Sequence, residues 1–190
     1  MSEAAVQYDV DTGLEKQVLD LKKRSVKLYE SRRYLCSEAV LFTLNHAFDG
    51  GLSHDQVIAM AAPFSMAMGE SGCLCGALSG AVLGTGLILG QKRSGRQRRI
   101  LRQHAAELHN RFKLAHGATC CRVLTKKVRQ DKRAHFRHCA SLTGEAAEMA
   151  ARLILQARPE LVQSAQAGSE AKKISGFKGL VLNLTQRFAR

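Results

Sequence analysis

The stretch from residue 72 to residue 90, GCLCGALSGAVLGTGLILG, constrains the fold of this chain most strongly, because it contains no charged side chain. Glycine recurs there at every fourth position, at Gly72, Gly76, Gly80 and Gly84. In a helix these glycines form one stripe, and each costs about 1 kcal/mol of helix propensity relative to alanine. The pattern predicts a helix whose backbone is closely approached by neighbouring elements or by a cofactor.

Two interpretations of this helix compete. Its length is just sufficient to span a bilayer, and a stripe of small residues can serve as a packing face between membrane helices. However, its many glycines, together with a serine, a threonine and two cysteines, make it a weak membrane span, and no second candidate follows. We therefore favour the central helix of a helical bundle.

The rest of the chain also favours helices, because it has two prolines, no tryptophan and abundant Ala, Leu, Lys and Arg. We predict an all-α fold, a bundle of roughly six to eight helices around the central Gly/Cys-rich helix. Residues 1–167 would form a helical cysteine-cluster domain, and residues 168–190 a basic amphipathic tail that ends in a helix. The other expected helices cover 14–31, 36–48, 54–62, 91–115, 132–157 with an interruption near Gly144, and 160–167. Residues 64–71 are expected to form a loop, and residues 117–130 a further segment that opens at Gly117.

Positive charge is concentrated in the middle of the chain. Residues 91–137 hold fifteen basic and two acidic side chains, and the whole chain has a net charge of +13. Such a field attracts anions, although a solvated helix face is the simpler interpretation. An acidic protein or a membrane surface could dock on 92–137 and 172–190. Nucleic acid is the least favoured partner, because only Phe112 and Phe136 accompany the charge. The glycine helix or the tail could also form a homodimer.

Six cysteines provide the main indication of function. The first thirty residues do not resemble a secretory signal, so we expect a cytoplasmic protein, with membrane association through the basic segments left open. Thiols stay reduced in the cytosol, where clustered cysteines more often bind metal or perform redox chemistry than crosslink a fold. A chain with 45% hydrophobic residues can build a core without crosslinks.

The cysteines occur as two close pairs and two single residues. On a helix, Cys73 and Cys75 would point about 200° apart, so each close pair is expected to give one thiol to a common centre. The centre would then take Cys36, one cysteine from 73 and 75, one from 120 and 121, and Cys139. Four thiolates can bind zinc or an iron–sulfur cluster. Three histidines lie close enough in sequence to replace a thiolate: His116, His135 and His138.

Four sequence boxes carry a family resemblance. They are Cys36-Ser37-Glu38-Ala39-Val40-Leu41, Cys75-Gly76-Ala77-Leu78-Ser79-Gly80, Cys121-Arg122-Val123-Leu124-Thr125, and the segment that opens at Cys139. The chain resembles, over roughly residues 20–157, the putative redox-active protein family named for its Cys…Cys-Gly-Ala-x-x-Gly…Cys…Cys signature. A related domain occurs in split-Soret cytochromes with an iron–sulfur centre. The resemblance implies a small helical domain with the four signature cysteines at one site.

The expected function is an iron–sulfur redox or electron-transfer protein that acts on a redox protein partner or a small substrate. Cys36, Cys75, Cys121 and Cys139 would hold the cluster, either [2Fe-2S] or [4Fe-4S]. Cys73 and Cys120 are additional to the signature and would be extra ligands or an internal dithiol pair. Two alternatives remain open: a metal-free thiol–disulfide redox protein or sensor, and a basic scaffold that binds an acidic partner with a structural metal. Whether the protein is an enzyme is left open.

Overall fold

The computed structural model describes residues 3–90 and 94–162, and all the regular elements in these ranges are helical. The all-α prediction is confirmed. The tail 168–190 lies outside the described residues, so its predicted separation from 1–167 stays a prediction. The elements are, in chain order, α1 (Glu3–Glu30), α2 (Cys36–Ala47), α3 (His54–Ala61), the 3-10 helix η1 (Ala62–Phe64), α4 (Ser65–Glu70), α5 (Gly76–Leu89), α6 (Gly95–His116), α7 (Cys121–Leu124), α8 (Lys132–Ala157) and the 3-10 helix η2 (Pro159–Leu161).

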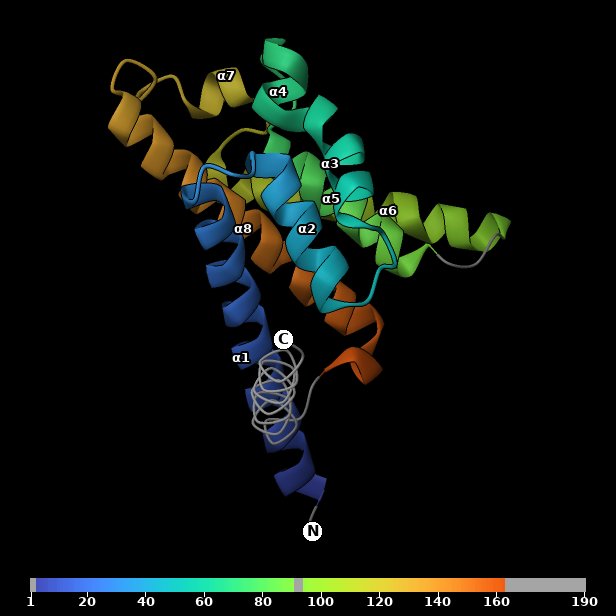
Figure 1. Cartoon of the computed structure of the whole chain (residues 1–190). Helices are drawn as coiled ribbons and strands as arrows, with labels where there is room; N and C mark the ends of the chain where they lie inside the picture. Colours follow the sequence, from blue (N-terminus) through green and yellow to red (C-terminus); the bar gives the residue numbers. More distant parts are fainter. Residues whose placement is uncertain (1–2, 91–93, 163–190) are drawn as a thin grey trace, which may run out of the picture.

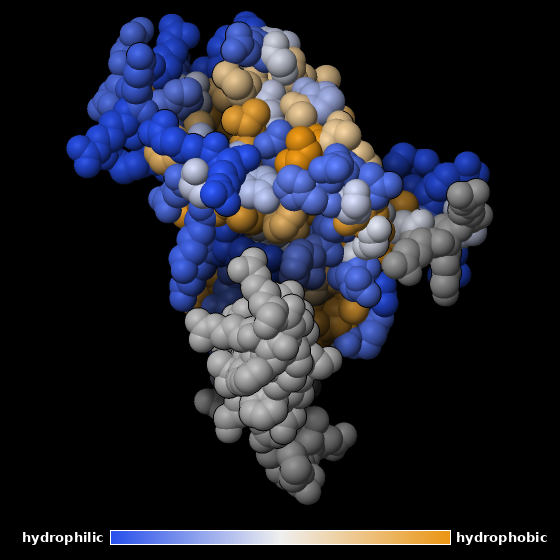
Figure 2. Space-filling model, viewed as in Figure 1, coloured by the Kyte–Doolittle hydropathy of each residue, from blue (hydrophilic) through white to orange (hydrophobic). Residues whose placement is uncertain are grey.

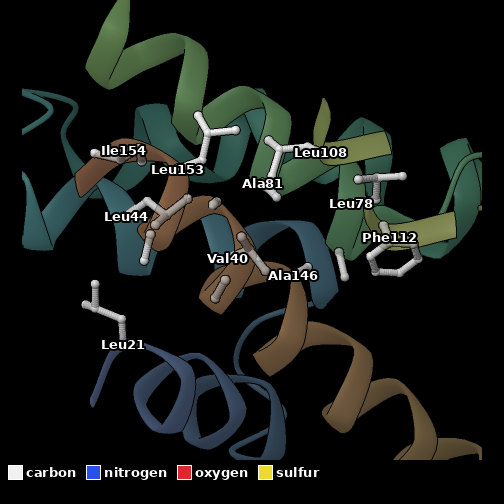
Figure 3. Packing of buried hydrophobic residues seen from close by; sticks show 14 of the residues in the cluster. Leu21, Val40, Leu44, Leu78, Ala81, Leu108, Phe112, Ala146, Leu153 and Ile154 are labelled. Atoms are coloured by element: carbon white, nitrogen blue, oxygen red, sulfur yellow. The ribbon is translucent and has the colours of Figure 1, made fainter. Parts of the chain in front are cut away.

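The core lies between α2, α5 and α8, and α1 and α6 cover it (Figure 1). Each helix contributes an apolar face to a single buried cluster, part of which Figure 3 labels. Leu44, Leu78, Phe112 and Ile154, from four different helices, are almost completely buried. No helix within the described ranges is long and apolar enough to cross a membrane.

The glycine stripe of α5 permits the close approach that the sequence predicts. A methyl group at Gly80 would lie 2.5 Å from the carbonyl oxygen of Ser37, and one at Gly84 would collide with the side chain of Leu44. Both contacts come from α2, so the stripe is the surface on which α2 packs. Gly72 differs from the prediction: it precedes α5 and has a φ of 96°, which favours glycine.

The long helices α1 and α8 pack side by side. Helix α8 is continuous through Gly144, so the predicted interruption there is wrong. The reason is packing, because a methyl group at Gly144 would lie 2.5 Å from the side chain of Val26 on α1. Further along, the Arg152 guanidinium pairs with the carboxylates of Glu15 and Glu148, which ties α8 to α1.

Helix α1 begins at Glu3, earlier than the predicted residue 14, because the apolar stripe that locates the helix starts only at Leu14. Helix α3 begins as predicted, at a capping box in which Ser53 and Gln56 exchange hydrogen bonds. Residues 64–71, expected to be a loop, contain the short turn α4, which bears on the site described below.

Candidate cysteine centre

All four signature cysteines lie at or near helix ends. Cys36 is the first residue of α2, and Cys75 directly precedes α5. Cys121 is the first residue of α7, and Cys139 lies two turns into α8. These four are free thiols.

The first of these thiols is positioned by a capping box at the start of α2. The carboxylate of Glu38 accepts a 2.7 Å hydrogen bond from the backbone N–H of Leu35. This places Glu38 in the interior, where only 6% of it is exposed. The backbone N–H groups of Ser37 and Met66 both act on the Cys36 sulfur and lower the pKa of that thiol, against the larger opposing effect of burial.

The N–H group of Met66 comes from an unusual turn. From Met66 to Gly69 the φ angles run from 53° to 63°, so α4 is a left-handed turn rather than an ordinary helix. This conformation costs roughly 1–2 kcal/mol for each residue other than glycine, and such strain is concentrated at functional sites. The sequence gives no signal for this turn, because Met66, Ala67 and Met68 have no preference for positive φ.

Cys75 is the most buried of the four thiols, with 4% exposed. It occupies the N-cap position of α5, so the backbone N–H groups of Ala77 and Leu78 act on its sulfur. The next residue has no side chain, and a methyl group at Gly76 would lie 2.5 Å from the Cys36 sulfur. Gly76 therefore lets the start of α5 lie directly against the first signature thiol.

Cys139 has a hydrogen-bonding partner that comes from another helix. The hydroxyl of Tyr29, near the end of α1, makes a side-chain hydrogen bond with the Cys139 sulfur. The Tyr29 ring stacks on Phe136 with 5.1 Å between ring centroids, and the guanidinium of Arg32 lies 4.6 Å from the Phe136 centroid. These contacts fix the hydroxyl beside the thiol.

The four thiols influence one another electrostatically. Burial is the main cause that raises the pKa of each, to about 12 for Cys75 and Cys139. Negative charge at Cys36 raises the pKa of the other three, and charge at Cys121 raises the pKa of Cys75 and Cys139. The four thiols therefore occupy one neighbourhood, and burial keeps them protonated at neutral pH.

The thiols are not arranged tightly around a point. Within residues 3–90 and 94–162, no group of three or more His, Cys, Asp and Glu side chains is placed to hold a metal ion. The hydrogen-bonding groups around the sulfurs are backbone amides and the Tyr29 hydroxyl.

Of the three candidate histidines, His116 ends α6, and His135 and His138 lie in the first two turns of α8. The imidazole of His116 stacks on Phe112, with 4.4 Å between ring centroids, and its Nε2 atom lies 3.4 Å from a Glu145 oxygen. Burial lowers the pKa of His116, with a smaller contribution from the neighbouring His138, while Glu145 opposes the shift. His135 and His138 are half-buried on α8. The described contacts of His116 are with Phe112, Glu145 and His138, and none of them is with a cysteine.

The remaining two cysteines form a disulfide. The sulfurs of Cys73 and Cys120 are joined, which corresponds to the internal-pair alternative of the sequence analysis rather than to free extra ligands. Both residues are half-buried and adjoin signature cysteines, since Cys73 is two residues before Cys75 and Cys120 directly precedes Cys121. The disulfide therefore joins the two segments that carry the second and third signature thiols.

The surface at this end of the bundle is partly apolar and partly basic. Met60, Met66, Met68 and Val123 are each 44–59% exposed. Figure 2 shows apolar residues over α3 and α4, next to a strongly hydrophilic area over α7 and the start of α8. That area is rich in lysine and arginine, with a single acidic residue between 121 and 137. A surface of this kind attracts anionic molecules.

The fold and the site define a small all-helical protein with four signature thiols at one end. The chain belongs to the family described as putative redox-active protein (C_GCAxxG_C_C), which matches residues 34–153. In this chain the central box reads Cys-Gly-Ala-Leu-Ser-Gly from Cys75 to Gly80, so cysteine precedes glycine, whereas the name of the family has glycine before cysteine. No curated protein and no solved structure matches the chain. Family membership supports a redox role.

The raised thiol pKa values predict alkaline sensitivity of the metal-free protein. Thiols with an ordinary pKa near 9 lose their protons in the unfolded chain before the folded thiols of Cys75 and Cys139, whose pKa is about 12. The free energy of unfolding is therefore unaffected by these thiols below pH 9 and falls between pH 9 and 12. The loss at pH 10 should be about 1 kcal/mol for each thiol. Urea unfolding at pH 8 and pH 10 measures this loss. A Cys139→Ala variant should lose less over the same interval, and an equal loss in both proteins would contradict the assignment.

Proposed function

We propose that this protein is an iron–sulfur redox protein whose cluster is bound by Cys36, Cys75, Cys121 and Cys139. The observation that carries the proposal is the electrostatic proximity of four free thiols from four separate segments. Cysteine thiolates are the usual ligands of such clusters, and the clusters carry single electrons. Burial makes isolated thiolates unfavourable at this site, so a positively charged iron centre would supply the compensation that deprotonation needs.

The loose arrangement of the thiols fits a cluster better than a single ion. A tetrahedral zinc site with Zn–S bonds of about 2.3 Å requires sulfurs only about 3.8 Å apart. A cluster that contains several irons and bridging sulfides is larger, so its ligands stand further apart. The lack of a tight ligand group among the described residues therefore argues against a preformed zinc site more than against a cluster.

The backbone around the thiols is also suited to a cluster. The N–H groups near Cys36 and Cys75 would stabilise negative charge on the ligand sulfurs, and hydrogen bonds of this kind help to set the reduction potential. The Tyr29 hydroxyl would act in the same way at Cys139. Gly76 leaves the space between the sulfur of Cys36 and the start of α5 free of side-chain atoms.

Metal analysis of protein purified without oxygen tests the proposal. The protein should be brown, with absorption between about 400 and 450 nm that bleaches on reduction, and should contain iron and acid-labile sulfide in equal amounts. Protein that binds zinc but no iron would support the structural-metal alternative. Protein that binds neither after reconstitution with iron and sulfide would refute the proposal.

A further inference from the structure

The Cys73–Cys120 disulfide lies beside the four signature thiols but is distinct from them. It joins the segment before α5 to the segment before α7, 47 residues further along the chain. Both cysteines are half-buried, as is the neighbouring signature cysteine Cys121, whereas Cys75 is almost fully buried. The disulfide pair is therefore more accessible to another molecule than Cys75 is.

Other contacts hold these two segments together independently of the sulfurs. The N–H of Cys75 donates a 2.8 Å hydrogen bond to the carbonyl of Thr119, and the N–H of Arg122 donates a 3.1 Å bond to the carbonyl of Gly72. In each segment, one of these two bonds involves a residue before the disulfide cysteine and the other involves a residue after it. Cleavage of the sulfur–sulfur bond would leave both of them in place.

The side chain of Arg122 completes this clamp. Its guanidinium donates a 2.7 Å hydrogen bond to the carbonyl of Ser71 and covers Gly72, where a methyl group would lie 2.5 Å from the guanidinium. Glycine at position 72 thus leaves room for the arginine.

From this arrangement we propose that Cys73 and Cys120 form a second, two-electron redox site that exchanges disulfides with dithiol and disulfide molecules. Because the clamp persists without the disulfide, the reduced thiols remain opposed and can close again without refolding. If the disulfide were only a structural crosslink, the two segments would separate or unfold when it is cleaved. The proposal does not depend on the iron–sulfur cluster.

The exchange conserves atoms and electrons. A thiolate of an external dithiol attacks one sulfur of the Cys73–Cys120 bond, which forms a mixed disulfide and releases the other cysteine as a thiolate that takes up a proton. The second thiol of the external molecule, after losing its proton, then attacks the mixed disulfide and releases the second cysteine. The external dithiol becomes a disulfide, and two electrons and two protons are transferred to the pair. A disulfide substrate reverses these steps.

The test follows Cys73 and Cys120 individually in the full-length protein. The protein is reduced with dithiothreitol, reoxidised with oxidised glutathione, alkylated at intervals and analysed by peptide mass spectrometry. Both cysteines should become reduced without loss of helical circular dichroism, and should then re-form their mutual disulfide. Residue-specific labelling makes this result independent of iron content, so a failure of the cluster proposal would not affect it.

Two variants test the role of the Arg122 clamp and the disulfide exchange separately. Arg122→Ala should slow closure of the Cys73–Cys120 bond by about tenfold, because a charge-assisted hydrogen bond is lost. The control Arg129→Ala, at an exposed arginine of the same region, should leave the rate unchanged. Cys73→Ser should retain one glutathione on Cys120. A disulfide that is reduced only in denaturant, or whose reduction abolishes the helical signal, would overturn the proposal.

Discussion

Replacement of any one signature cysteine with alanine is expected to lower the iron content of the anaerobically purified protein by more than about tenfold. The reason is that each thiol comes from a different segment, so no other signature thiol can substitute for it, and the neighbouring Cys73 and Cys120 are joined in a disulfide. Iron and acid-labile sulfide, measured together with visible absorption, give the readout. The four variants are Cys36→Ala, Cys75→Ala, Cys121→Ala and Cys139→Ala.

The disulfide pair provides the matched control. A Cys73→Ser, Cys120→Ser double variant removes two sulfurs from the same segments but none of the free thiols, so it should keep its iron. Helical circular dichroism of each metal-free variant separates loss of a ligand from loss of the fold. If the double variant lost iron as severely as the single variants, the cluster would need six cysteines. If a folded single variant retained full iron, its cysteine would not be a ligand.

The general fold was predictable because it depends on local patterns. Helix ends at the capping box of Ser53 and at the glycines after Ala47 follow from residue type alone. The close approach to α5 was also predictable, since an uncharged helix with a stripe of glycines is stable only where neighbouring elements pack closely on it. The set of four cysteines came from family resemblance, because spacing alone did not separate Cys75 from Cys73 or Cys121 from Cys120.

Other features of the site depend on contacts between distant segments and were missed for that reason. The left-handed turn of Met66 and Met68 contradicts the preferences of its own residues, so only the surrounding structure can determine it. The hydrogen bond from Tyr29 to Cys139 joins residues 110 positions apart, and no local sequence pattern links the two. Gly144 resembled a helix interruption, although its role is to let α8 approach α1.

The second large effect is expected at Gly76. A methyl group there would lie 2.5 Å from the sulfur of Cys36, 2.9 Å from the carbonyl oxygen of Phe64 and 3.3 Å from the Cα atom of Ser65. Two of these three atoms belong to the backbone directly before the left-handed turn, so side-chain rotation cannot relieve the clash. Gly76→Ala should therefore lower the free energy of unfolding by about 3 kcal/mol, which corresponds to a fall in Tm of roughly 10 °C.

Helix α5 itself contains the control for this substitution. At Gly86 an added methyl group would have no atom of a neighbouring element within 4 Å among the described residues, so Gly86→Ala should stabilise the helix by up to about 1 kcal/mol. The opposite changes in the free energy of unfolding distinguish a steric conflict at the cysteine centre from the low helix propensity that both glycines share. Because Gly76→Ala also displaces the Cys36 sulfur, it should reduce iron content, whereas Gly86→Ala should not. Equal stability and equal iron content in both variants would mean that the Cys36 sulfur does not lie against the start of α5.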